Sequence, residues 1–290
     1  MFRGSIPALV TIFRDEALDQ KAFLDFVRWQ VDEGSHGLVP CGTTGESATL
    51  TSAEHRRLIE LAIEGAAGRV KVIAGCGSND TAHAIALTRS ARDAGADAAL
   101  HVPPYYNRPN QEGIYAHLAA IAEAVDIPIV LYNVPARTIT DISVETMARL
   151  ARIANVIGVK DATGNLARVS AQRAACGGHF IQLSGNDDMA LGFSAMGGTG
   201  CISVTANVAP RLCAEFQNAC LSGDWKEALR LQDRLYPLHA ALFTDASPGP
   251  VKYALSRVRN VSAELRLPMT PASEASRRSV DSALAHAGLL

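Results

Sequence analysis

This 290-residue chain repeats one pattern eight times: a short apolar segment followed by an amphipathic helical segment. The predicted strands cover residues 5–13, 37–41, 71–76, 98–102, 128–133, 156–160, 180–184 and 200–204. Valine and isoleucine are crowded together in several of them without polar alternation, which is typical of strands buried on both faces of a parallel sheet. Eight alternations of about 20–30 residues each predict that the sheet closes into a (β/α)8 TIM barrel of the α/β class.

The pattern changes after Gly223, beyond which no strand segment is recognisable. Three further helices are predicted to begin near Asp224, Val251 and Thr270-Pro271. Pro237 is expected to bend or end the first of them, because proline cannot donate a helical hydrogen bond. We therefore expect residues 1–223 to form a catalytic barrel and residues 224–290 to form a C-terminal helical region packed on it.

The sixth predicted strand ends on Lys160, in the run Val156-Ile157-Gly158-Val159-Lys160-Asp161. Burial in such a strand disfavours the ammonium form, and full burial lowers the pKa of a lysine by up to roughly 3–5 units. A neutral lysine amine is a nucleophile towards aldehydes and ketones, with which it forms a Schiff base. The alternative is an ion pair with Asp161, although successive strand side chains point to opposite faces. This stretch alone leaves both interpretations open.

A glycine-rich turn follows the second predicted strand and contains Thr43 and Thr44 between Gly42 and Gly45. Active sites of such barrels form at the carboxyl ends of the strands, so this turn should lie at the same mouth as Lys160. Its backbone N–H groups and hydroxyls can hold a small carboxylate. An ordinary glycine turn with capping threonines is the alternative.

Further candidates follow the fourth and fifth predicted strands. Tyr132 ends a buried strand, where its phenol could move protons to and from a carbinolamine; a core tyrosine is the alternative. Arg137 suits a second carboxylate through its bidentate fork, with a surface ion pair as the alternative. Tyr105 and Tyr106 could line the mouth or contact another subunit.

Composition argues against several other classes of function. Lysine and arginine total 27 against 29 acidic residues, and no basic run appears, so neither nucleic acid nor a membrane surface is an expected partner. No apolar segment approaches the roughly 18–20 residues that span a bilayer. The histidines His55 and His83 lack the spacing of metal ligands, so no metal site is predicted. We expect reduced core thiols, and hence a cytoplasmic protein, from the six unpaired cysteines Cys41, Cys76, Cys176, Cys201, Cys213 and Cys220.

Six motifs in chain order give the sequence a family resemblance: GTTGE (42–46), PYYNRP (104–109), LYNVPART (131–138), GVKDATGN (158–165), LSGND (183–187) and ISVTANV (202–208). Over nearly its whole length the chain resembles the 4-hydroxy-tetrahydrodipicolinate synthases, or dihydrodipicolinate synthases, within the pyruvate-dependent class I aldolases. The resemblance implies a lyase that condenses pyruvate with L-aspartate 4-semialdehyde in diaminopimelate and lysine biosynthesis. It also implies a homotetramer built as a dimer of dimers, and no cofactor apart from a covalent imine between pyruvate and Lys160.

The resemblance implies roles for individual residues as well. Lys160 would be the Schiff-base lysine, served by a proton relay of Tyr132, Thr43 and Tyr106, the last reaching across a dimer interface. Thr44 would hold the pyruvate carboxylate, and Arg137 the carboxylate of aspartate semialdehyde. The backbone of Gly185 and Ile202 would line the site.

Bacterial members of this family often carry a lysine-inhibition site at the dimer interface. Residues of this chain that match the site are Ser47, Ala48, His55, Asn79 and Tyr105. Ser52 and His83 depart from the family pattern, His83 at a position where a glutamate commonly pairs with the inhibitor's ammonium. Feedback inhibition by lysine is therefore a hypothesis.

Two other functions remain as alternatives. The first is another pyruvate-dependent aldolase, such as N-acetylneuraminate lyase or a deoxy-sugar-acid aldolase, which would need a long polar pocket in which Arg137 is misplaced. The second is a non-catalytic relative that binds a keto acid as a sensor. The intact set of lysine, tyrosines and threonine argues against a sensor, which need not keep all of them.

Overall fold

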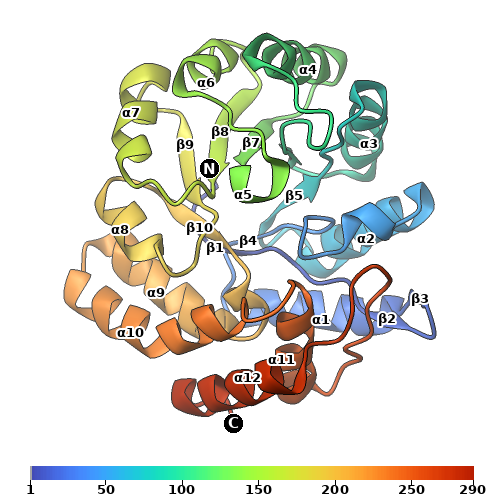
Figure 1. Ribbon diagram of the computed structural model, residues 1–290, viewed down its shortest axis with the longest axis vertical. Helices are drawn as coiled ribbons and strands as arrows, with labels where there is room; N and C mark the ends of the chain where they lie inside the picture. Colours follow the sequence, from blue (N-terminus) through green and yellow to red (C-terminus); the bar gives the residue numbers. More distant parts are fainter. Residues whose placement is uncertain (1) are drawn as a thin grey trace.

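The computed structural model describes residues 2–290, and a ring of eight parallel strands lies at its centre (Figure 1). The strands are β1 (Gly4–Pro7), β4 (Gly37–Leu38), β5 (Lys71–Gly75), β6 (Ala98–His101), β7 (Ile129–Asn133), β8 (Val156–Asp161), β9 (Ile181–Ser184) and β10 (Gly200–Ser203). They are hydrogen-bonded in the order β1-β10-β9-β8-β7-β6-β5-β4. The Val39 N–H donates to the Pro7 carbonyl at 2.9 Å, and the Leu9 N–H donates to the Val39 carbonyl at 2.9 Å. These bonds join the two ends of the sheet, so the predicted TIM barrel is confirmed.

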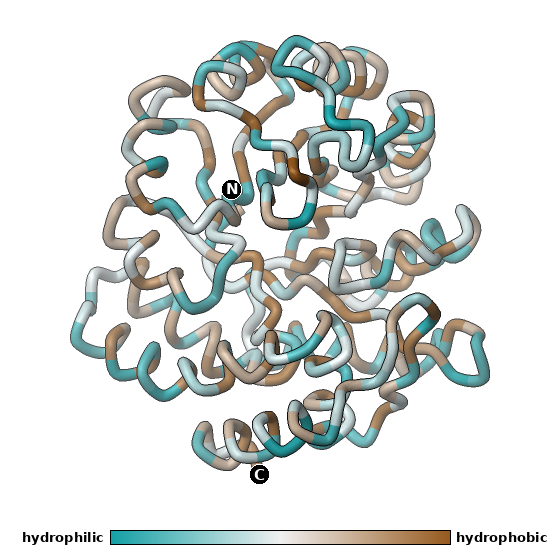
Figure 2. The backbone as a smooth tube through the Cα atoms, in the orientation of Figure 1, coloured by the Kyte–Doolittle hydropathy of each residue, from teal (hydrophilic) through white to brown (hydrophobic). Residues whose placement is uncertain are grey.

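Helices surround this ring. They are α1 (Gln20–Asp32), α2 (Ser52–Ala66), α3 (Thr81–Ala94), α4 (Gln111–Ala124), α6 (Val144–Leu150), α7 (Ala167–Cys176), α8 (Ala190–Ala195) and α9 (Pro210–Ser222). Three short helical turns lie in the loops after strands: η1 (Ser47–Thr49), α5 (Pro135–Thr138) and η2 (Thr205–Asn207). Figure 2 shows apolar stretches concentrated on the strands and hydrophilic ones on the outer turns. This distribution follows from burying both faces of the sheet.

Alternation along β8 decides which of its side chains reach the inside of the barrel. Val159 packs in the apolar cluster that α4 and α6 form outside the ring. Lys160, the next residue, lies against Tyr132, which belongs to the interior cluster with Val130, Leu183 and Ile202. The barrel interior is thus a packed apolar core, and the amine of Lys160 lies within it.

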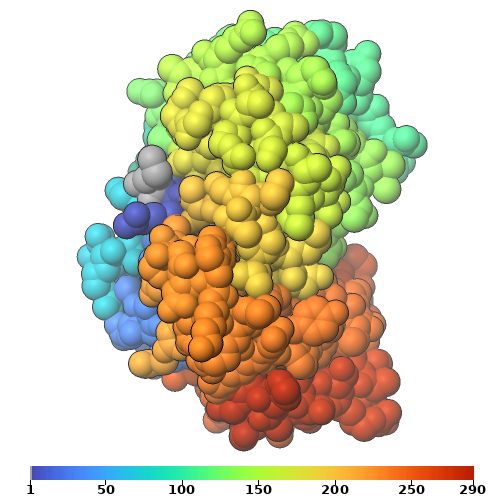
Figure 3. All heavy atoms as spheres, turned by 90° about the vertical axis from the view of Figure 1, so that its left-hand side faces the viewer, coloured from blue at the N-terminus to red at the C-terminus, as the bar shows by residue number. Residues whose placement is uncertain are grey.

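Three C-terminal helices, α10 (Trp225–Ala241), α11 (Gly249–Arg259) and α12 (Glu274–Ala287), pack beside the barrel (Figures 1 and 3). Leu231, Leu255 and Leu284 belong to the same apolar cluster as residues of α1, α2 and α9. The helical content of residues 224–290 is as expected. The division of the chain at 223/224 stays a prediction, because one apolar cluster joins both parts.

Two helix limits differ from the expectation: Pro237 does not end its helix, and the last helix begins later than predicted. Helix α10 continues through Pro237, because buried leucines on either side of it, Leu235 and Leu238, hold the helix against its neighbours. The last helix begins at Glu274 instead of at Thr270, since the Ser273 hydroxyl accepts the Ser276 N–H and caps it there.

The first two predicted strands are shorter than expected. Strand β1 ends at Pro7, and the chain then runs as a buried connection to a hairpin of β2 (Phe13–Arg14) and β3 (Ala17–Leu18). In this connection the Val10 N–H donates to the Asn207 side chain at 2.9 Å, so the backbone pairs with a loop instead of a strand. Strand β4 ends at Leu38, and Cys41 takes a left-handed conformation with φ 57°.

Candidate active site

Lys160 lies at the carboxyl end of β8 and is 6% exposed. Its Nζ is 4.1 Å from the centre of the Tyr132 ring, because β7 and β8 pair Tyr132 directly with Lys160. Asp161 points the other way, where its carboxylate accepts hydrogen bonds from Thr163 and Gln172, each at 2.6 Å. The ion pair between Lys160 and Asp161 is therefore not formed. The amine lies against an aromatic face inside the barrel.

Gly185 directly follows β9, and Ile202 lies in β10, the next strand along the ring. The Gly185 N–H donates to the Asp161 carbonyl at 2.6 Å. A Cβ at Gly185 would come within 3.1 Å of the Lys160 Cε and 2.7 Å of the Ala162 Cβ. Only glycine therefore lets the end of β9 pack this closely against the lysine stem. Ile202 is 1% exposed in the same interior cluster as Tyr132.

The turn after β4 brings Thr43 to the mouth of the barrel and buries Thr44. Gly45 is required by close packing, since a Cβ there would lie 2.9 Å from the Leu9 carbonyl. The turn ends at Glu46 in a left-handed conformation, with φ 55°. Close packing at Gly45 and the left-handed backbone at Glu46 therefore constrain the conformation of the turn from Gly42 to Glu46.

A buried ion pair holds this turn from the C-terminal region. The Glu46 carboxylate accepts a hydrogen bond from the Lys252 Nζ at 2.7 Å and another from the Arg266 N–H at 3.1 Å. The side chains of Lys252 and Glu46 are 1% and 2% exposed. Helix α11 and the segment after it thus brace the threonine turn, a contact that the sequence analysis did not anticipate.

A cavity of about 480 Å³ opens at this mouth. Among the barrel residues that line it are Thr43, Tyr132, Val134, Arg137 and Thr138. Its lining includes four of the five candidate effector residues, Ser47, Ala48, His55 and Tyr105, together with Ser52 and His83. Four residues of the C-terminal region also line it: Ser247, Pro248, Pro268 and Met269. The residues that line the cavity within the described chain do not include Lys160, Thr44, Gly185, Ile202, Asn79 or Tyr106.

Tyr106 stands apart from the other candidates. It is 90% exposed and has a left-handed backbone with φ 70°, which is uncommon for an aromatic residue. Asn79 fixes the loop around it, because the Asn107 side chain donates to the Asn79 carbonyl at 2.9 Å and the Asn79 side chain donates to the Tyr105 carbonyl at 3.3 Å. A single chain therefore does not bring Tyr106 to Lys160, and its expected role across a dimer interface stays a prediction.

His55 lies in the wall of the cavity with one ring nitrogen engaged. Its Nε2 donates to the Gly75 carbonyl at 2.7 Å, and its Nδ1 is buried without a partner. Burial lowers the pKa of His55, which favours the neutral ring. Nδ1 is therefore an acceptor that faces no donor of this chain.

The described residues also bear on metal binding, membrane insertion and the state of the cysteines. Within residues 2–290 there is no cluster of three or more histidine, cysteine or acidic side chains that could hold a metal ion. Among the helices of that same stretch, none has the length and apolar character needed to cross a bilayer. All six cysteines are free and buried, and burial raises the pKa of the Cys41, Cys76 and Cys201 thiols.

Comparison with known proteins identifies relatives of the chain over its full length. The family model described as the dihydrodipicolinate synthetase family matches residues 1–287. A relative from Rhizorhabdus wittichii, named 4-hydroxy-tetrahydrodipicolinate synthase, is 66% identical over 290 residues, which is 100% of both chains.

Solved structures of dihydrodipicolinate synthases have the same fold as this chain over its full length. A chloride-inhibited dihydrodipicolinate synthase from Acinetobacter baumannii, complexed with pyruvate, is 43% identical with a TM-score of 0.97 over 100% of both chains. The enzyme from Cyanidioschyzon merolae with lysine bound is 36% identical with a TM-score of 0.96, covering 100% of this chain and 99% of that one. This chain therefore belongs to the dihydrodipicolinate synthetase family.

Proposed function

We propose that this chain condenses pyruvate with L-aspartate 4-semialdehyde to give 4-hydroxy-tetrahydrodipicolinate, a step of diaminopimelate and lysine biosynthesis. The observation that carries the proposal is the buried amine of Lys160 beside the Tyr132 ring at the mouth of the barrel. The name of the 66% identical relative supports this reaction over that of another pyruvate-dependent aldolase.

The reaction begins at the amine of Lys160. Its nitrogen attacks the ketone carbon of pyruvate, and loss of water from the carbinolamine gives an imine. Loss of a methyl proton gives an enamine, whose carbon attacks the aldehyde of the second substrate. The amine of that substrate then attacks the imine carbon and closes the ring, which releases Lys160.

Each proton transfer needs an acid or base near the imine. The Tyr132 phenol is held within the barrel beside the amine, and Thr43 lines the same cavity. We assign to them the transfer of protons to and from the carbinolamine, with Tyr106 of a second subunit completing the relay. The large exposure of Tyr106 supports a contact outside its own chain.

The pyruvate carboxylate is assigned to Thr44, and the backbone at Gly185 and Ile202 is assigned to the lining of the site. The close approach of Gly185 to the Lys160 stem supports this placement, since it puts the Gly185 backbone beside the lysine that forms the imine. The Acinetobacter baumannii relative complexed with pyruvate supports the choice of ligand.

Replacing Arg137 by alanine should raise the KM for aspartate semialdehyde far more than the KM for pyruvate. Arg137 is exposed in the cavity lining, where its guanidinium can bind the carboxylate of the second substrate. Losing such a charged hydrogen bond corresponds to roughly a ten- to hundredfold effect. Steady-state kinetics with each substrate varied in turn measures the difference.

Arg152→Ala is the matched control, because Arg152 is exposed and precedes β8, at the opposite end of the barrel. It should leave both KM values unchanged. An equal rise of both KM values in Arg137→Ala would show general damage and remove Arg137 from the binding site.

The proposed reaction is tested by an assay that couples product formation from pyruvate and aspartate semialdehyde to a reductase. We expect turnover that requires both substrates. Turnover of a sialic acid or deoxy-sugar acid instead would favour another aldolase, and pyruvate binding without turnover of any aldehyde would favour a keto-acid sensor.

Lysine is proposed as an inhibitor that binds in the cavity lined by Ser47, Ala48, His55 and Tyr105. His55 lies in the wall of this cavity, and the Cyanidioschyzon merolae relative with lysine bound supports this ligand. Titration of the coupled assay with lysine should reduce the rate. Full activity at millimolar lysine would exclude the effector site.

The assembly proposed with this function is a homotetramer formed by two tight dimers in the cytoplasm. Exposed Tyr105 and Tyr106 on the loop after β6 support a subunit contact there. This contact would bring Tyr106 of one chain to the cavity of the other.

A further inference from the structure

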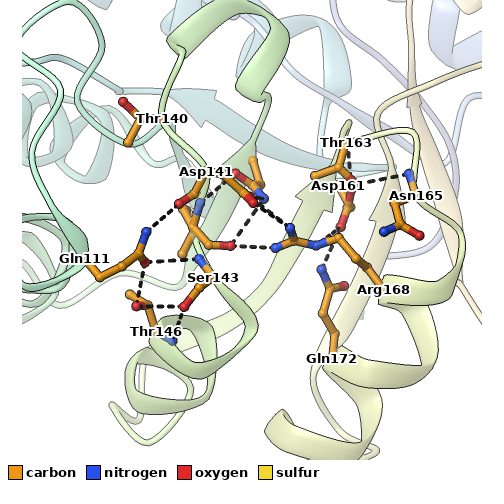
Figure 4. A network of polar contacts seen from close by, with 12 residues as sticks. Gln111, Thr140, Asp141, Ser143, Thr146, Asp161, Thr163, Asn165, Arg168 and Gln172 are labelled. Carbon is orange, nitrogen blue, oxygen red and sulfur yellow. Dashed lines mark hydrogen bonds and ion pairs between the residues drawn. The ribbon is translucent and has the colours of Figure 1, made fainter.

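A polar network lies behind the two residues at the centre of the site (Figure 4). Asn133 follows Tyr132 in β7 and Asp161 follows Lys160 in β8, so both side chains point out of the barrel. Asp141, which belongs to the loop that follows α5, lies beside Asn133. The network therefore connects the outer faces of the two strands with that loop.

Arg168 of α7 is at the centre of this network. Its Nη1 lies 2.9 Å from both carboxylate oxygens of Asp141, and its Nη2 donates to the Ile142 carbonyl at 2.5 Å. Its Nε lies 3.7 Å from the Asp161 carboxylate. The Arg168 side chain is only 13% exposed, so these contacts are partly shielded from water. One guanidinium thus joins the 141–142 segment to β8.

The loop from 134 to 142, which we call the Arg137 loop, depends on these contacts at its base. The Asn133 side chain donates to the Asp141 carboxylate at 2.6 Å and accepts the Ile142 N–H at 3.0 Å, which closes the loop. At its side, the Thr140 hydroxyl donates to the Pro104 carbonyl at 3.0 Å, just before Tyr105. Arg137 is part of this loop. The position of Arg137 therefore depends on the contacts that fix the base of the loop at Asn133, Asp141 and Ile142.

We infer that Arg168 is a positioning residue that fixes the Arg137 loop relative to the strand that carries Lys160. The inference rests on the proposed function, in which Arg137 binds only the second substrate. Asp161 keeps the Thr163 and Gln172 contacts when Arg168 is lost, so β8 and its lysine stay in place. Arg168 therefore affects the binding of aspartate semialdehyde and not the imine with pyruvate.

Kinetics of Arg168→Met, with each substrate varied, tests the inference. We expect the KM for aspartate semialdehyde to rise about tenfold, the lower end of the effect of a charged hydrogen bond, because Arg137 itself remains. The KM for pyruvate and the yield of imine trapped with borohydride should not change. Arg168→Lys should recover part of the loss, since lysine can pair with Asp141 but lacks the fork.

Arg149→Met is the matched control. Arg149 of α6 makes two hydrogen bonds to Glu112 of α4, in the same part of the molecule but away from the Arg137 loop. Its loss should change neither KM. A further comparison uses the double variant: once Arg137→Ala is present, Arg168→Met should add nothing to the KM for aspartate semialdehyde.

Equal losses for both substrates in Arg168→Met, or effects that simply add to those of Arg137→Ala, would overturn the inference. If Arg168→Met does not fold, Asp141→Asn tests the same contact from its exposed side and must show the same selective rise. A failure of the proposed function looks different, because the unmodified protein would then show no condensation of pyruvate with aspartate semialdehyde.

Discussion

Lys160→Met is expected to lower kcat/KM for the condensation by more than about 10³-fold, because no other group can form the imine with pyruvate. Methionine fills a similar volume in the barrel interior, where Lys160 is 6% exposed. Burying an unbranched apolar side chain there costs less than burying an amine, so the fold should persist. The coupled assay measures the activity, and urea denaturation measures the free energy of unfolding.

Lys71→Met is the control for this experiment. Lys71 opens β5 at the other end of the barrel, where its side chain is 62% exposed beside Asp97. This variant should retain full activity. If Lys160→Met kept more than a tenth of the activity, or lost it only through unfolding, the catalytic role of Lys160 would be contradicted.

Lys252→Met is expected to lower the free energy of unfolding by about 3–5 kcal/mol, the usual effect of removing one partner of a buried ion pair. Burial lowers the pKa of Lys252, while the adjacent Glu46 carboxylate favours the charged form. The two groups are 2.7 Å apart and almost fully buried. Without Lys252, the Glu46 carboxylate keeps only the Arg266 N–H of these two contacts and loses its counter-charge.

Urea denaturation at one protein concentration measures the loss, and two further variants show its cause. Arg257→Met, on the same helix α11, removes an exposed pair with Asp281 and should cost less than about 1 kcal/mol. Adding Glu46→Gln to Lys252→Met removes the remaining charge and should restore part of the stability. Equal effects of Lys252→Met and Arg257→Met would contradict a structural role for the buried pair.

The barrel was predictable because its determinants are local. Crowded β-branched residues mark a strand that is buried on both faces, and eight such strands leave few ways to close a sheet. The opposite directions of Lys160 and Asp161 follow from the alternation of a strand alone. The end of β1 and the continuation of α10 through Pro237 were not predictable, because Asn207 pairs with the backbone at Val10 and tertiary packing keeps Pro237 within a helix.

Parts of the site could not be predicted, because they depend on contacts between distant residues. Glu46 and Lys252 are separated by 206 positions, and no local pattern indicates their pairing. Pro268 lines the cavity although the C-terminal region was expected only to pack on the barrel. Arg168 similarly looks like an ordinary helix residue until the fold places it against Asp141.

The central claim is that Lys160 forms an imine with pyruvate, and borohydride reduction tests it most directly. Protein treated with pyruvate and borohydride is digested, and the modified peptide is located by mass spectrometry, with Lys160→Met as the control. We expect one reduced pyruvyl group on Lys160 and none in the variant. An unmodified Lys160, or a pyruvyl group on another lysine such as Lys252, would contradict the account.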